Sequence, residues 1–300
     1  MERRPKAPAA ARGRFVPPDG LRWASATDAG RAWLERLPRL LDESVEEWSL
    51  EVGEPFRYAY ASLALPAKLP DGGDAVLKIC FPHRESEHEA AALARWNGEG
   101  AVRLLAHDAR RWALLIERCR PGTALRELGA DAALDVVVGL LPRLWVPAGD
   151  PFRPLAEEAA WWASYLPDRC EQAGRPLERA LVDAAVEALH DLAPTQGEQV
   201  LLHQDLHADN ILRAEREPWL VIDPKPLVGE REFGLAPLVR GFELGHSERD
   251  VRHRLDRLSA ELALDRERAR LWSLAQTLAW SFGSEYLEQH VDTARWLLNA

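Results

Sequence analysis

The fold is decided by the stretch Leu201-Leu-His-Gln-Asp-Leu-His-Ala-Asp-Asn-Ile-Leu212, which is followed after a short spacer by Trp219-Leu-Val-Ile-Asp223. Asp205 is followed five residues later by Asn210, and Asp223 ends the next apolar run. The apolar runs after Asn210 and before Asp223 have the pattern of short buried strands. A polar loop followed by two such strands is expected to bring the three polar side chains together at one strand end.

Phosphoryl transfer from a nucleotide requires this set of side chains. One carboxylate accepts the proton of the attacking hydroxyl, while an amide oxygen and a second carboxylate hold Mg²⁺ on the phosphates. The catalytic loop of protein kinases has the same order of Asp, Asn and a metal-binding Asp after a strand. Asp205 is therefore the candidate base, and Asn210 and Asp223 are the candidate magnesium ligands. The alternative is a polar turn in which Asp and Asn serve only the turn.

The composition indicates a globular protein. The chain has 300 residues, which suit one large domain or two lobes, and 47% of them are hydrophobic. The formal net charge of −10 at pH 7 argues against nucleic acid as the main partner. Such a charge is compatible with a cationic small-molecule substrate.

The cysteines and the apolar runs give expectations about the compartment. Cys80, Cys119 and Cys170 have no close pairing and no metal-ligand spacing, which fits a reducing cytosol. No apolar run approaches the ~20 residues of a membrane span, and residues 1–15 lack the apolar stretch of a secretory signal. We expect a cytoplasmic protein with a loose N-terminal tail and no membrane partner, and its oligomeric state is left open.

The first 116 residues have the pattern of a small lobe built on an antiparallel sheet. After a helical pattern over residues 27–41, strands are expected over 48–56, from 58 onward, and over 75–81. Pro70-Asp-Gly-Gly73 is a hairpin signal between the last two. Short connections therefore make the three strands antiparallel neighbours.

A lysine lies inside the third expected strand. Lys78 stands between Leu77 and Ile79, and strand alternation places Val76 on the same face as Lys78. In the functional interpretation, Lys78 grips nucleotide phosphates and Val76 contacts the adenine. The alternative is an edge-strand lysine that points to water.

An acidic residue, Glu89, follows Lys78 eleven residues later in the chain. Residues 83–96 are expected to form a helix, and Glu89, Leu93 and Trp96 fall on one stripe of it. An acid on the apolar stripe just after the lysine strand is what a Lys–Glu ion pair requires, and kinases use such a pair to orient the lysine. Glu85, one turn earlier, is the competing candidate.

The pattern of the sequence changes from strand-like to helix-like at residues 117–122. Residues 112–116 form an expected strand, and Glu117-Arg-Cys-Arg-Pro-Gly122 follows it. Because a strand that ends in Pro-Gly separates a strand-rich from a helix-rich half, residues 117–122 are the expected hinge. From residue 123 to residue 300, helical periodicity dominates and predicts a larger, mainly helical lobe.

The loop His203-Gln-Asp-Leu-His-Ala-Asp-Asn210 resembles the H-G-D-x-x-x-x-N loop of the aminoglycoside phosphotransferases and their kinase-like relatives. Gln204 stands where that family usually has glycine. Further stretches are similar to the streptomycin 6-phosphotransferase and hydroxyurea phosphotransferase group, namely residues 95–105, 201–207, 218–224 and 227–230.

The resemblance implies an α+β, two-lobed protein-kinase-like fold that uses ATP and Mg²⁺. It implies O-phosphorylation of a small hydroxylated molecule, in some members an antibiotic. By the same analogy, Lys78 held by Glu89 contacts the α- and β-phosphates, and the carbonyl of Glu117 and the amide of Cys119 contact the adenine edge. The expected acceptor is a streptomycin-like aminoglycoside. In one alternative, the acceptor is hydroxyurea or another small metabolite. In the other, the chain is a nucleotide-binding regulator without turnover.

Several side chains near the expected site have open roles. His203 is expected to be structural, while His207 either positions substrate or holds the loop. Lys225 adds a positive charge after Asp223, which makes a cationic antibiotic a less certain substrate. Candidates for the acceptor pocket are acids and aromatic residues of the second lobe, namely Asp150, Glu157, Glu158, Glu285, Trp161 and Trp162.

Overall fold

The computed structural model describes residues 17–57, 61–282 and 286–300. The chain divides into two compact units, one made of residues 1–82 and 105–117 and the other of residues 83–104 and 118–300. The expected first lobe, residues 1–116, thus includes the segment 83–104, which groups here with the second unit. The expected N-terminal tail, the expected strand start at residues 58–60 and Glu285 lie outside the described residues.

The first unit is built on a five-stranded sheet with the order β1-β2-β3-β5-β4. Its strands are β1 (Glu51–Val52), β2 (Ser62–Lys68), β3 (Asp74–Cys80), β4 (Leu104–Asp108) and β5 (Ala113–Glu117). The pairs β1–β2 and β2–β3 are antiparallel, as the hairpin signal indicated. The strand expected over residues 48–56 is shorter, since Pro55 has no N–H to extend the ladder with β2.

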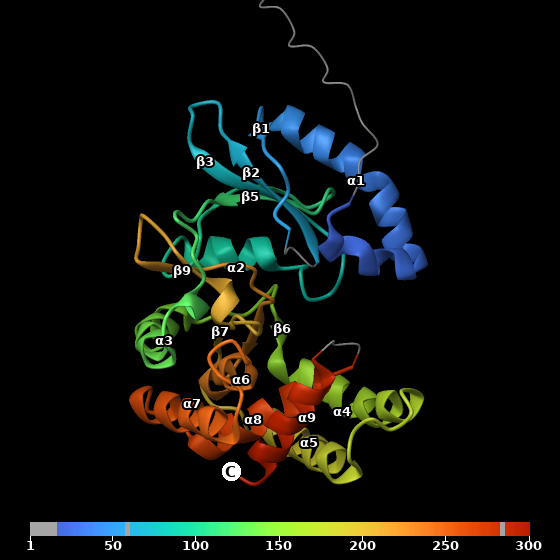
Figure 1. The fold of residues 1–300 in the computed structure, drawn as a ribbon, viewed down its shortest axis with the longest axis vertical. Helices are drawn as coiled ribbons and strands as arrows, with labels where there is room; N and C mark the ends of the chain where they lie inside the picture. The colour runs from blue at the N-terminus through green and yellow to red at the C-terminus, as the bar shows by residue number, and fades with distance from the viewer. Residues whose placement is uncertain (1–16, 58–60, 283–285) are drawn as a thin grey trace, which may run out of the picture. The chain divides into compact units, whose positions relative to one another are not determined.

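One long helix covers one face of this sheet. The chain enters through η1 (Asp19–Ala26) and α1 (Asp28–Glu47), and Thr27 caps α1 by accepting a hydrogen bond from the Gly30 amide at 3.0 Å. Trp33 of α1 packs in an apolar cluster with Ile79 of β3, and Figure 1 shows α1 beside the strands of this unit. Because alternate residues of a strand point to opposite faces, Lys78 lies on the face of β3 away from α1.

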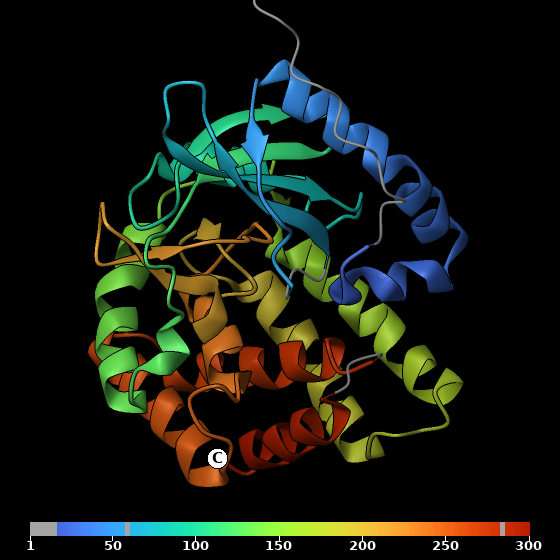
Figure 2. The same ribbon diagram turned by 45° about the horizontal axis from the view of Figure 1, so that its top comes forward.

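The second unit is mainly helical. Its helices are α2 (Glu89–Trp96), α3 (Ala130–Leu144), α4 (Leu155–Gln172), α5 (Arg179–Leu192), α6 (Ala236–Arg240), α7 (Glu248–Glu261), α8 (Arg266–Ala279) and α9 (Leu287–Leu298). α8 packs against α5, α6, α7 and α9, so it forms the centre of this unit (Figure 2). Among the described residues, the helices are all too short or too polar to cross a bilayer.

The helix expected over residues 83–96 begins only at Glu89, and residues 84–88 form turns. A tertiary contact accounts for the difference, because the carbonyl of Arg84 accepts a hydrogen bond from the Arg153 guanidinium at 3.0 Å instead of continuing the helix. Glu85 is therefore not a helical neighbour one turn before Glu89.

Two small sheets flank the polar loop of residues 203–210. One contains β6 (Arg153–Pro154), β10 (Leu227–Gly229) and β7 (Val200–Leu202), and the other pairs β8 (Ile211–Arg213) with β9 (Trp219–Val221). The two strands expected after the loop are present as β8 and β9, whereas β6, β7 and β10 were not expected. The loop of residues 203–210 thus connects a strand of one small sheet to a strand of the other.

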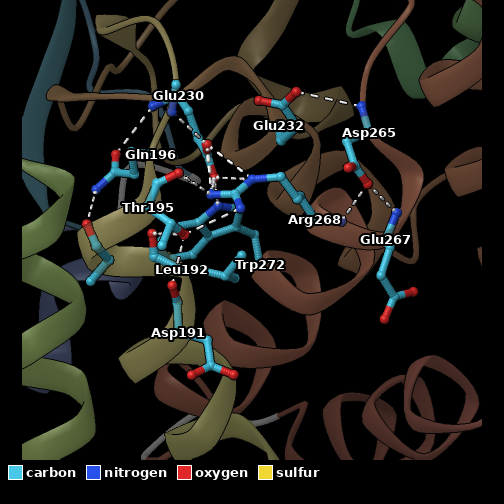
Figure 3. A network of polar contacts seen from close by, with 12 residues as sticks. Asp191, Leu192, Thr195, Gln196, Glu230, Glu232, Asp265, Glu267, Arg268 and Trp272 are labelled. Carbon is cyan, nitrogen blue, oxygen red and sulfur yellow. Dashed lines mark hydrogen bonds and ion pairs between the residues drawn. The ribbon is translucent and has the colours of Figure 1, made fainter.

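A buried carboxylate joins β10 to the central helix α8 (Figure 3). Glu230 follows β10 and is 2% exposed. It pairs with Arg268 of α8 at 2.8 Å and accepts hydrogen bonds from the Gly197 amide at 3.1 Å and from the indole N–H of Trp272. Arg268 also donates to the carbonyl of Thr195 at 3.1 Å. These contacts fix the small sheet to the helical core.

Candidate catalytic site

The β8–β9 hairpin brings Asn210 and Asp223 to the same end. The antiparallel register pairs Ile211 with Val221, Asn210 directly precedes β8, and Asp223 lies two residues after β9. The amide of Ile222 donates to the carbonyl of Asn210 at 3.0 Å. The start of one strand and the end of its partner are therefore adjacent, as the sequence predicted.

The loop between β7 and β8 adds Asp205 to this end. The side-chain nitrogen of Asn210 donates to the backbone carbonyl of Asp205 at 2.8 Å and lies 3.2 Å from Nε2 of His207. Both contacts use the amide nitrogen, which leaves the amide oxygen available as a ligand. Together with the Asp223 carboxylate, this oxygen fits the preference of Mg²⁺ for oxygen ligands.

The carboxylate of Asp205 is held by two cations. Lys225 forms an ion pair with Oδ2, and a guanidinium nitrogen of Arg240 lies 3.1 Å from Oδ1. Burial opposes ionisation of Asp205, but the charges of Lys225, His207 and Arg240 outweigh it and keep the pKa of Asp205 below its ordinary value. Asp205 is therefore an ionised carboxylate at neutral pH.

Lys225 also connects Asp205 to Asp223, because its Nζ lies 3.8 Å from Oδ2 of Asp223. The structure thus joins Asp205, Asn210 and Asp223 in one cluster. The sequence analysis did not predict the contact of Arg240 with Asp205. The residues next to Arg240 in the sequence form no motif that indicates this contact.

His203 connects the catalytic loop to the segment after β9. Its Nε2–H donates to the carbonyl of Ile222 at 2.9 Å, and its ring stacks on the ring of Trp96. Burial lowers the pKa of His203 to about 4, so the ring is neutral at physiological pH. These contacts give His203 a structural role.

His207 lies against Glu243, with Nδ1 at 3.3 Å from Oε1. Burial opposes a charge on the ring, but the hydrogen bond to Glu243 and the charges of Asp205 and Glu243 outweigh it and raise the pKa of His207 above its ordinary value. This pair holds the middle of the loop, and the charge of His207 is one of the influences that lower the pKa of Asp205.

Gln204 shows why glycine is usual at its position. Its backbone has a φ of 62°, in the left-handed region that costs little for glycine and more for other residues. The side chain is 1% exposed, and the backbone carbonyl accepts a hydrogen bond from Gln276 of α8 at 2.8 Å. The turn next to Asp205 is thus formed with a residue that is bulkier than glycine.

Two acidic residues named in the sequence analysis, Glu85 and Glu158, interact electrostatically in this region. Burial and the charges of Asp205 and Glu158 raise the pKa of Glu85, against the opposing effect of Lys225 and Arg84. Glu158 is fully buried and pairs with Arg84 at 2.8 Å and with Arg153 at 3.0 Å. Among the acids considered from the sequence, Glu158 is therefore engaged in ion pairs, whereas Glu85 lies within the electrostatic field of Asp205.

The expected nucleotide-binding residues are divided between the two units. Lys78, which is 6% exposed, and Val76 lie on β3 in the first unit, while Glu89, 1% exposed, begins α2 in the second. Glu117 ends β5 in the first unit, and Cys119 lies just beyond it in the second. The Lys78–Glu89 pair and the adenine contacts therefore remain predictions.

The fold is that of the kinase-like phosphotransferases. The choline kinase LicA from Streptococcus pneumoniae has a TM-score of 0.61 with 14% sequence identity, and the alignment covers 88% of this chain and 98% of that chain. The expected fold class, with an antiparallel sheet in the N-terminal part and a mainly helical C-terminal part, is confirmed.

Sequence comparison identifies the family within this class. The model of the aminoglycoside/hydroxyurea antibiotic resistance kinase family matches residues 48–282. The hydroxyurea phosphotransferase of Kitasatospora aureofaciens is 42% identical over 263 residues, which cover 86% of this chain and 75% of that protein. The streptomycin 6-kinase of Streptomyces griseus is 40% identical over 271 residues, which cover 87% and 88% respectively. This chain belongs to the aminoglycoside/hydroxyurea antibiotic resistance kinase family. As a kinase, it is a phosphotransferase that uses a nucleotide.

Proposed function

We propose that this chain transfers the γ-phosphoryl group of ATP to a hydroxyl of a small molecule, with a streptomycin-like aminoglycoside as the first candidate. The observation that carries the proposal is the convergence of Asp205, Asn210 and Asp223 in one cluster. The candidate acceptor comes from the 40% identical streptomycin 6-kinase.

In the proposed reaction, Asp205 orients the acceptor hydroxyl and takes its proton. The hydroxyl oxygen attacks the γ-phosphorus, the bond from that phosphorus to the β–γ bridging oxygen breaks, and ADP leaves with the bridging oxygen. Asn210 and Asp223 would hold Mg²⁺, which when bound neutralises charge on the phosphates. Most of the acceleration comes from positioning and from charge stabilisation.

The nucleotide-binding residues are assigned by the order of the chain within the kinase family. Lys78, oriented by Glu89, contacts the α- and β-phosphates. Val76 packs against the adenine, and the carbonyl of Glu117 and the amide of Cys119 bond to the adenine edge. The burial of Lys78 supports this assignment, because a buried ammonium requires an anionic partner.

Hydroxyurea is the second candidate acceptor. The hydroxyurea phosphotransferase at 42% identity supports it, and so does the charge next to the base. Lys225 and Arg240 both contact Asp205, and two cations at the base disfavour an acceptor that brings positive charge to the reacting hydroxyl. A regulator without turnover is less well supported, because Asp205, Asn210 and Asp223 are all present and lie in one cluster.

The test is a panel of hydroxylated compounds that includes streptomycin and hydroxyurea, with phosphorylated product detected by mass spectrometry. Asp205→Ala should lower ATP-dependent product formation by about 10²- to 10⁴-fold while the nucleotide still binds in calorimetry. Asp135→Ala serves as a control, because Asp135 on α3 is 70% exposed and pairs with Arg257, away from the Asp205 cluster. Undiminished turnover in Asp205→Ala would remove Asp205 from the role of base.

A further inference from the structure

One ammonium group lies between the two carboxylates of the cluster. Lys225 forms an ion pair with Oδ2 of Asp205, and its Nζ lies 3.8 Å from Oδ2 of Asp223. The backbone amide of Lys225 donates to the carbonyl of His203 at 3.0 Å, which fixes the base of this side chain beside the catalytic loop. Lys225 therefore reaches both the proposed base and a proposed metal ligand.

We propose that Lys225 is a catalytic residue that leaves Asp205 when ATP binds and contacts the phosphoryl group in transfer. This inference rests on the proposed function. The nucleotide is held on the side of Asp223 and the hydroxyl on the side of Asp205, so the phosphoryl group crosses the space between these carboxylates. The ammonium already lies there. A cation at this place stabilises the charge on the equatorial oxygens of the transferring group.

The contacts of Asp205 show why this lysine has to move. Lys225 takes Oδ2 and Arg240 takes Oδ1, so both carboxylate oxygens are paired with cations. A base that accepts the hydroxyl proton needs an oxygen directed at that hydroxyl. Incoming phosphate oxygens compete for the ammonium, and the release of Oδ2 then makes Asp205 a stronger base.

The two cations differ in freedom. The guanidinium of Arg240 lies 4.7 Å above the ring of Trp280, and this stacking together with the bond to Oδ1 holds it in place. Lys225 has a flexible stem with three rotatable donors, which lets a lysine exchange one anion for another. Arg240 therefore keeps the carboxylate oriented, while Lys225 moves toward the phosphate.

The reaction remains balanced as described for the proposed function. The new bond joins the hydroxyl oxygen to phosphorus, the bond to the bridging oxygen breaks, and the proton goes to Asp205. Lys225 exchanges no proton in this step, because it contributes only charge and hydrogen bonds.

The test compares affinities for a non-hydrolysable ATP analogue and for ADP, because only the analogue carries a γ-phosphate. With Mg²⁺ present, Lys225→Gln should weaken binding of the analogue by about tenfold, the size of a hydrogen bond to a charged group, and leave binding of ADP unchanged. It should also lower kcat by about 10²-fold. Lys225→Arg, which keeps the charge, should recover part of the preference for the analogue.

Lys68→Gln is the matched control, because it removes a lysine that is 51% exposed and pairs with Asp74 at the surface. This variant should leave both affinities and kcat at the wild-type values. Thermal unfolding is measured for all variants, and Lys225→Met, which keeps the stem without a donor, takes the place of Lys225→Gln if that variant does not fold.

The outcomes separate this inference from the proposed function. A drop in kcat with an unchanged ratio of the two affinities would overturn it, because Lys225 would then only hold Asp205. An unchanged kcat in Lys225→Gln would overturn it as well. A wild-type protein that phosphorylates no compound of the panel would instead overturn the proposed function.

Discussion

Two buried carboxylates of the second unit, Asp205 and Glu230, are both paired with arginine, yet their surroundings differ. Glu230 accepts hydrogen bonds from Arg268 and Trp272 on α8 (Figure 3) and from the backbone amide of Gly197. All of these donors belong to packed elements or to the backbone. The oxygens of Glu230 thus accept hydrogen bonds from a guanidinium, an indole N–H and a backbone amide at the same time.

Asp205 is paired with one arginine and one lysine. Arg240 is stacked on Trp280, whereas Lys225 is a flexible cation that also lies near Asp223. Gln204 in the loop and Asp223 after β9 both have left-handed backbone conformations, and such strain concentrates at functional sites. The comparison teaches that burial and pairing with arginine are common to both carboxylates, so these features do not distinguish the proposed base from the structural carboxylate. The difference is the second cation of Asp205, Lys225, which also lies near Asp223.

Removal of the Glu230 carboxylate should have the largest effect on stability. Glu230→Ala leaves the Arg268 charge, the Trp272 indole N–H and the Gly197 amide without their acceptor, so we expect a loss of about 3–5 kcal/mol in the free energy of unfolding. Urea denaturation monitored by circular dichroism measures it. The many donors to Glu230 make the effect a property of the structure rather than of catalysis.

The control for this prediction is Glu198→Ala. Glu198 is 60% exposed and pairs with Arg231 at the surface, and such pairs contribute about 0–1 kcal/mol. If Glu230→Ala and Glu198→Ala unfold at the same urea concentration, the Glu230 network does not hold the small sheet to α8.

Close to Asp205, the buried His203 should instead make the free energy of unfolding depend on pH. The pKa of His203 is about 4 in the folded protein, against an ordinary value of 6.5. Between these pH values the unfolded state binds more protons, so acidification from pH 6.5 to pH 4 favours unfolding. We expect His203 to account for a loss of roughly 3 kcal/mol over this window.

His203→Gln tests this expectation, because glutamine keeps a donor for the carbonyl of Ile222 but does not titrate. The free energy of unfolding of the variant should fall less steeply from pH 6.5 to pH 4 than that of the wild type. Part of the slope should remain, since burial also lowers the pKa of His290 to about 4. Parallel profiles of variant and wild type would contradict the assignment.

The sequence predicted those parts of the molecule that depend on local patterns. Asp205, Asn210 and Asp223 could be brought together because strand alternation and a short hairpin determine where their side chains lie. Arg240 could not be found, because it reaches Asp205 across 35 residues of sequence through the packing of α6. The segment around Glu85 was predicted as helix because its periodicity continues, and only the contact of the Arg84 carbonyl with Arg153 ends it.

The smallest expected effect concerns the backbone of the turn next to Asp205, the proposed base. Gln204 has a φ of 62°, a conformation that costs a residue with a Cβ about 1 kcal/mol more than glycine. Both Gln204→Gly and Gln204→Ala remove the buried side chain, so their difference isolates the backbone. Gln204→Gly should be more stable than Gln204→Ala by about 1 kcal/mol in urea denaturation.

The control is the exposed Gln199, whose φ is not positive. There Gln199→Gly should be less stable than Gln199→Ala, because glycine at this position only adds entropy to the unfolded chain. If glycine and alanine ranked the same way at both positions, strain in the turn would not explain the usual preference for glycine there.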